Sequence, residues 1–143
     1  MPENFWPEFK PANIVDPKSI IEEQARILPK LTGEKVIAIV NKTEKNFLDN
    51  NDYIPYAFIY EFYITSKMLP TYKFRVFNLS YNLPIYPLRL SVDSDILKEL
   101  NIETIFGSRS FDVENEQDLK TSLKLILNST KVRDVVSSIM RIT

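Results

Sequence analysis

The sequence predicts an α+β fold: an N-terminal helix, a four-stranded antiparallel β-meander, and C-terminal helices packed on one face of the sheet. Apolar residues recur with a helical period over residues 17–31 and again after residue 115. Between these segments lie four runs rich in β-branched and aromatic residues, with prolines at their ends. The length of 143 residues fits one domain, which we place at residues 16–143, after an arm of residues 1–15.

The arm is expected to be extended, because prolines at positions 2, 7 and 11 are incompatible with a continuous helix. Phe5, Trp6 and Phe9 lie between these prolines. We expect the three aromatic side chains to hold the arm across the surface of the domain. The alternative is that the arm docks on a partner.

The first helix is predicted over residues 17–31. Asp16 is a favourable N-cap, and Pro17 suits the first helical position. Pro29 should weaken the last turn, and Gly33 suits the C-terminal cap.

The four strands are predicted at residues 35–41, 56–65, 71–81 and 85–92, and a polar loop follows the first of them. The connections after the second and third strands are short, which predicts hairpins and an antiparallel meander. Pro87 lacks a backbone donor, so the fourth strand is expected at an edge or with a bulge.

Alternation along the strands predicts an apolar face and a charged face. In the second strand Phe58 and Phe62 share the apolar face, opposite Glu61 and Tyr63. In the third strand the same rule assigns to the charged face Lys73, Arg75, Phe77, Leu79 and Tyr81. If Thr65 pairs with Thr71, Glu61 lies opposite Arg75 and Tyr63 opposite Lys73.

Beyond the meander the sequence predicts a helical turn at 95–100 and a possible short strand at 102–106. Asn115 is then expected to cap a helix whose first turn is acidic, which suits the helix dipole. A last helix is predicted over residues 131–141.

Composition excludes several classes of site. The chain has no Cys and no His, so the usual zinc, iron–sulfur, thiolate and His-base sites cannot form, and we expect no cofactor and no metal. No apolar run is long enough for a membrane span, and no signal peptide is visible, so a soluble, cytoplasmic protein is expected. The net charge of −1 makes nucleic acid an unlikely partner.

The charged sheet face is the candidate partner-binding site, with Glu61, Tyr63, Lys73, Arg75 and Arg89. Tyr and Arg dominate the energetics of protein interfaces, which favours a protein partner. Aromatic and basic residues on a sheet also suit single-stranded nucleic acid, and a half-buried surface with a Glu61–Arg75 pair is the simplest interpretation.

A second candidate is an anion-binding loop formed by Gly107, Ser108, Arg109 and Ser110. Backbone N–H groups, hydroxyls and an arginine are suited to phosphate, but a surface turn is the commoner role of such a segment. The acidic run at residues 112–118 is interpreted as helix-terminal charge, because its spacing does not match a known cation loop.

The function expected from these features is that of a non-enzymatic protein-interaction module. Small bacterial-type domains of this composition include immunity proteins, antitoxins, inhibitors and chaperones; this analogy rests on size and composition alone. The alternatives are a sheet that binds single-stranded nucleic acid, or a small enzyme based on carboxylates. No catalytic residue is identified, and a homodimer is one possible assembly.

Overall fold

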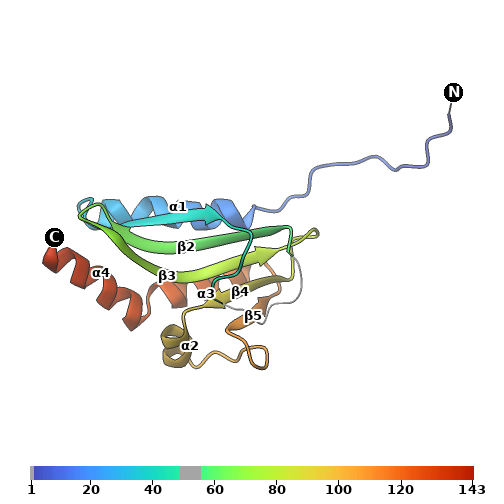
Figure 1. Cartoon of the computed structure of the whole chain (residues 1–143). Coiled ribbons are helices and arrows are strands. Elements are labelled where there is room, and N and C mark those ends of the chain that lie inside the picture. Colours follow the sequence, from blue (N-terminus) through green and yellow to red (C-terminus); the bar gives the residue numbers. More distant parts are fainter. Residues whose placement is uncertain (1, 49–55) are drawn as a thin grey trace.

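The structure is a computed structural model, and it describes residues 2–48 and 56–143 (Figure 1). It has an α+β architecture with an antiparallel sheet of order β1-β2-β3-β4-β5. In chain order the elements are α1 (Pro17–Leu31), β1 (Ile37–Lys42), β2 (Phe58–Ser66), β3 (Leu69–Tyr81), β4 (Leu88–Val92), α2 (Ser94–Leu100), β5 (Ser110–Val113), α3 (Glu116–Leu127) and α4 (Thr130–Ile142).

The sheet has five strands, so the prediction of four was wrong. The fifth strand, β5, pairs antiparallel with β4, with Phe111 opposite Leu90 and Val113 opposite Leu88. The possible strand predicted at 102–106 is not a strand in the structure. β5 has only four residues, two of them polar. So short a segment shows little of the apolar–polar alternation that predicts a strand, and its hydrogen bonds come from pairing with β4.

The helix termini follow the predicted capping chemistry. The Asp16 carboxylate accepts a hydrogen bond from the Lys18 N–H, and α1 begins at Pro17. Asn115 accepts from the Asp118 N–H at 2.8 Å at the start of α3, as predicted. Ser129, which was not predicted as a cap, caps α4, and this helix begins at Thr130 and not at residue 131. These caps define where each helix starts and therefore which of its faces meets the sheet.

A β-bulge at Val76 corrects the predicted faces of β3. Phe62 lies opposite Phe77, but the next residue, Tyr63, lies opposite Arg75, which leaves Val76 without a partner in β2. One extra residue in a strand reverses the side on which the following residues lie. Three side chains predicted on the charged face are therefore buried in the core: Phe77, Leu79 and Tyr81.

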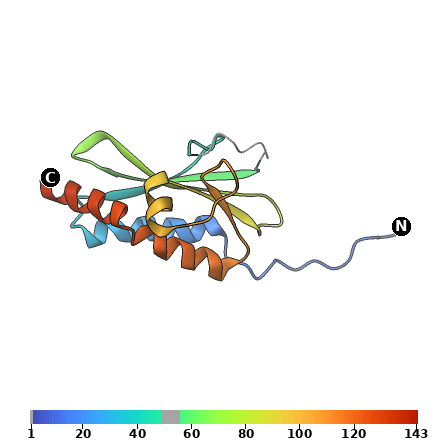
Figure 2. The same ribbon diagram turned by 90° about the horizontal axis from the view of Figure 1, so that it is seen from below.

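The core lies between the sheet and the helices α1, α3 and α4, which are on the same side of the sheet (Figure 2). Phe62 stacks on Phe77 with ring centroids 4.8 Å apart, and both are buried. The Tyr81 hydroxyl donates a 2.8 Å hydrogen bond to Asp16 and so joins β3 to the start of α1. Among residues 2–48 and 56–143 no helix lies on the opposite face of the sheet, which we call the open face.

The arm, residues 2–15, runs away from the domain (Figures 1 and 2). Phe5, Trp6 and Phe9 are 87%, 74% and 72% exposed, so the prediction that they hold the arm across the domain surface was wrong. Among the described residues, no helix combines the length and the apolar character that crossing a membrane requires.

Candidate functional site

The open face is built by alternate residues of the five strands. β2 places Glu61 and Tyr63 on it, and the Val76 bulge keeps Lys73 and Arg75 on the same side as Glu61. Because the bulge also directs Phe77, Leu79 and Tyr81 into the core, the open face near β4 is lined by polar residues instead of aromatic ones. These are Asn78, Ser80, Ser91 and Ser110, all of them buried.

Glu61 is the centre of the predicted site. It is only 4% exposed, and each of its carboxylate oxygens is paired with a cation. Lys73 Nζ lies 2.9 Å from Oε1, and Arg75 Nε lies 3.3 Å from Oε2. A buried carboxylate needs such partners, because removing a charge from water is costly unless it is paired and hydrogen-bonded. The triad carries a local charge of +1 on a face whose two cations remain partly exposed to solvent.

The predicted pair of Glu61 and Arg75 is present, although the predicted register is not. Glu61 lies opposite Asn78, and Tyr63 lies opposite Arg75. Thr65 does not pair with Thr71 but donates a 2.6 Å hydrogen bond to the Tyr72 carbonyl. The flexible Lys and Arg side chains reach diagonally to Glu61, so the ion pairs form across the bulge.

Two aromatic rings lie against the same cations. Lys73 Nζ is 4.1 Å from the centroid of the Tyr63 ring, and the Arg75 guanidinium carbon is 4.7 Å from that of Phe47. These separations are within the range of cation–π attraction. Both cations are thus held between a carboxylate and a ring, which restricts their rotamers.

Phe47 reaches the open face because the chain after β1 crosses it. Asn46 Nδ2 donates to Ser91 Oγ at 2.7 Å, and the side-chain amides of Asn46 and Asn78 are 2.7 Å apart. Ser91 Oγ is in turn 2.6 Å from Ser110 Oγ. Residues 43–48 therefore lie on the open face of the sheet (Figure 2). The sequence predicted only a polar loop here, and no spacing rule shows where a loop will dock.

Arg89, the fifth predicted residue, belongs to a separate pair. Its Nε lies 3.3 Å from Asp112 Oδ1 on the neighbouring strand β5, and its side chain is only 14% exposed. Its guanidinium carbon is 5.7 Å from the centroid of the Tyr56 ring. The structure therefore brings four of the five predicted residues together around Glu61 and gives Arg89 different partners.

The predicted anion-binding loop has its hydroxyls directed into the protein. Ser108 Oγ donates to the Ile105 carbonyl at 2.7 Å and accepts from the Ser110 N–H. Ser110 is buried in β5, and Gly107 has φ +73°, the left-handed conformation that a turn glycine readily adopts. Arg109 is exposed.

The acidic side chains of residues 112–118 include three that form ion pairs or hydrogen bonds with other side chains of the protein. Asp112 pairs with Arg89, and the Asp118 carboxylate accepts a 3.3 Å hydrogen bond from Asn115 Nδ2. Glu116 pairs with Lys120 one turn later, at 3.1 Å. Within residues 2–48 and 56–143, no group of three or more His, Cys, Asp or Glu side chains could hold a metal ion.

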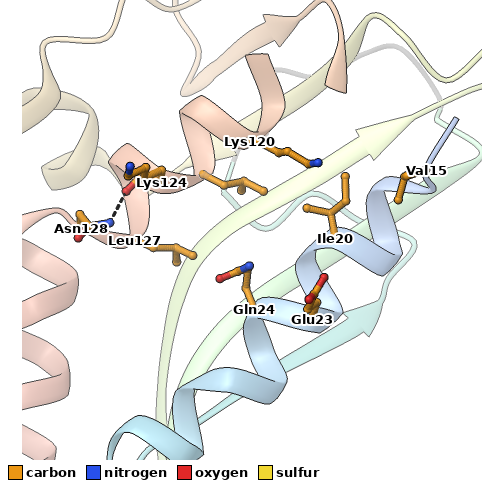
Figure 3. A pocket seen from close by; sticks show the side chains of 9 residues that line it. Val15, Ile20, Glu23, Gln24, Lys120, Lys124, Leu127 and Asn128 are labelled. Atoms are coloured by element: carbon orange, nitrogen blue, oxygen red, sulfur yellow. Dashed lines mark hydrogen bonds between the residues drawn. The ribbon is translucent and has the colours of Figure 1, made fainter. Parts of the chain in front are cut away.

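A groove on the helix side was not predicted from the sequence. A cavity of about 540 Å³ lies between α1 and α3 (Figure 3), and a second of about 250 Å³ continues it along α1. The two cavities share Gln24, Leu127 and Asn128. The periodicity of each helix predicts an apolar face, but the distance between two helices depends on tertiary packing.

No family model, curated protein or solved structure matches this chain in the three comparisons.

Proposed function

We propose that this chain is a non-enzymatic protein-interaction module that binds a partner protein through its open sheet face. The observation that carries the proposal is the buried Glu61, which holds Lys73 and Arg75 in place beside Tyr63 and Phe47. Side chains that are already ordered lose less conformational entropy on binding. Tyr and Arg are also the residue types that contribute most at interface hot spots.

The chemistry of this surface favours a partner with an acidic side chain next to an apolar one. Two cations share one carboxylate, so the cluster keeps a charge of +1 while its rings offer apolar contact. Arg75 and Lys73 keep 40% and 34% of their side chains exposed, which leaves N–H groups for a partner carboxylate. We also propose a cytoplasmic location, because a chain without Cys needs no oxidising compartment.

Single-stranded nucleic acid is the second candidate ligand, since the same face combines aromatic rings with cations. Stacking of a base requires an accessible ring face. Lys73 already lies over the Tyr63 ring and Arg75 over the Phe47 ring, so those cations would first have to move. This arrangement favours a protein partner.

The test is the double variant Tyr63→Ala with Arg75→Ala, used as bait beside the wild type. The matched control is Phe106→Ala with Arg133→Ala, which also removes one aromatic ring and one arginine from exposed positions. We expect wild type and control to recover the same partner and the double variant to lose it. With the purified partner, calorimetry should then show an affinity at least 100-fold weaker.

The double variant removes one of the two cations that pair with the buried Glu61, so we expect its free energy of unfolding to fall by about 1–3 kcal/mol. It should remain folded, because Lys73 still pairs with the Glu61 carboxylate. Circular dichroism and thermal unfolding would establish this. A folded double variant that still binds each partner with wild-type affinity would rule out the open face as the binding surface.

A further inference from the structure

The groove between α1 and α3 has an apolar floor and charged rims. Its floor and walls are formed mostly by apolar side chains. Val15, Ile20 and Leu123 lie at one end, and Ile27, Leu28 and Phe62 lie at the other. Lys120 and Lys124 line it from α3, and Glu23 lines it from α1 (Figure 3). Such a combination suits an extended apolar segment that carries charges of both signs.

The arm of residues 2–15 has the complementary character. Its three aromatic side chains are exposed, and the rings of Trp6 and Phe9 lie 6.1 Å apart, on the same stretch of extended chain. Glu3 precedes the aromatic residues, Glu8 lies between Trp6 and Phe9, and Lys10 follows. Large aromatic side chains exposed together are uncommon in monomers and mark sites of association.

We propose that the arm of one copy of this chain docks in the α1–α3 groove of a second copy, and that two copies exchange arms in a symmetric dimer. The aromatic rings fill the apolar floor. Glu3 and Glu8 face Lys120 and Lys124, and Lys10 faces Glu23. An exchange of this kind closes with two-fold symmetry, because each copy supplies one arm and one groove.

The dimensions of the arm and groove agree. A helix of 15 residues is about 22 Å long, and the segment from Phe5 to Phe9 spans roughly 13 Å when extended. The aromatic segment therefore fits within the length of α1. The whole arm can reach roughly 45 Å from Asp16, which is enough to cross to a neighbouring molecule.

The area is also sufficient for a stable dimer. One enclosed aromatic side chain buries about 150–250 Å². Two exchanged arms would therefore bury on the order of 1,000 Å² from their aromatic side chains. With the groove surface that they cover, the total reaches the standard size of a specific interface, about 1,600 Å².

The direction of the chain favours a second copy over the arm's own groove. Val15 lies at one end of the groove, and the arm leaves from there away from the domain (Figures 1 and 2). To enter its own groove the arm would have to reverse within a few residues.

Trp6 is the only tryptophan in the chain, so its fluorescence reports directly on the arm. The full-length protein would be followed from about 0.1 to 200 µM by Trp emission and by sedimentation velocity. We expect the emission to shift to the blue and the sedimentation coefficient to change from monomer to dimer over the same concentration range. The two curves should give one dissociation constant.

Variants of the full chain separate the contributions of the arm and the groove. Phe5→Ala with Phe9→Ala keeps the Trp6 reporter and should weaken association at least 10-fold; Phe106→Ala with Met68→Ala removes two other exposed apolar side chains and should have no effect. Lys120→Glu with Lys124→Glu should also weaken association about 10-fold. Adding Glu3→Lys and Glu8→Lys to the Lys120→Glu, Lys124→Glu variant should restore self-association.

Each remaining outcome would contradict the proposal. Blue-shifted emission in a monomer at every concentration would mean that the arm docks in its own groove. Red-shifted emission in a monomer at 200 µM would mean that the groove does not bind the arm. A dimer unaffected by the arm and groove variants would use another surface. The proposed function is tested separately, because Tyr63→Ala with Arg75→Ala should leave self-association unchanged.

Discussion

At the scale of single residues, Val76 has the largest effect on which side chains form the core. It has no partner in β2, and the side chains after it lie on the opposite faces from those that simple alternation predicts. Phe77 is therefore fully buried and stacks on Phe62. Without the bulge, Phe77 would lie beside Lys73 and Arg75 on the open face.

We expect Phe77→Ala to lower the free energy of unfolding by about 3–5 kcal/mol, because it deletes a fully buried ring and leaves a cavity. Phe106→Ala is the matched control, since Phe106 is fully exposed, and it should change the value by less than about 0.5 kcal/mol. Urea denaturation monitored by circular dichroism would measure both. Equal effects of the two substitutions would contradict the bulged register.

At the scale of secondary-structure elements, the hydroxyl of Tyr81 connects β3 to the N-terminus of α1. It donates to Asp16, which also caps the helix. Burial of the ring, followed by the hydrogen bond to Asp16 and the charge of Asp16, raises the pKa of Tyr81 above its ordinary value of 10.0. Since the pKa is higher in the folded state, this contribution to stability is complete below about pH 10 and is lost as the pH rises further.

We expect Tyr81→Phe to reduce the free energy of unfolding by about 1.5 kcal/mol at pH 7, because a hydrogen bond to a charged group is lost. Above pH 10 the wild type should lose stability more steeply than the variant. The Tyr81→Phe variant should still lose some stability above pH 10, because burial also raises the pKa of Tyr72 and of Tyr86.

Denaturation between pH 7 and 11 would measure this effect. Tyr63→Phe serves as control, because the Tyr63 hydroxyl has only a 3.5 Å contact with Asn41. If the free energy of unfolding of Tyr81→Phe had the same pH dependence as that of the wild type, the hydrogen bond between Tyr81 and Asp16 would not connect β3 to α1.

At the scale of the whole molecule, the charge balance limits the class of partner. The net charge is −1, and most cations of the open face are already paired with Glu61 or Asp112. Tight binding of single-stranded nucleic acid depends on unneutralised cations that displace counterions from the phosphates.

We expect binding to single-stranded DNA or RNA to be weaker than micromolar near physiological salt, as measured by fluorescence anisotropy with a labelled oligonucleotide. Lys124→Ala is the control for binding elsewhere on the molecule. Micromolar affinity with a steep salt dependence, abolished by Lys73→Ala with Arg75→Ala but not by the control, would instead support the nucleic-acid alternative.

The sequence by itself determined most of the local structure. Helix α1 begins and ends where Asp16, Pro17 and the apolar period predict, and Asn115 caps the start of α3 as predicted. The β-meander and the ionic contact between Glu61 and Arg75 were also predicted. These features depend on short-range rules of capping, alternation and turn formation, which act between residues close in the chain.

Only the tertiary structure decided the rest. The bulge at Val76, the fifth strand, the docking of Asn46 and Phe47 on the open face and the α1–α3 groove each depend on packing between distant segments. In the sequence of β3 the alternation changes phase at the adjacent apolar residues Val76 and Phe77, but only the pairing with β2 shows that this break is a bulge that moves the following side chains to the other face. The pattern of a strand is therefore local information, whereas its register and the face that it buries are determined by its neighbours.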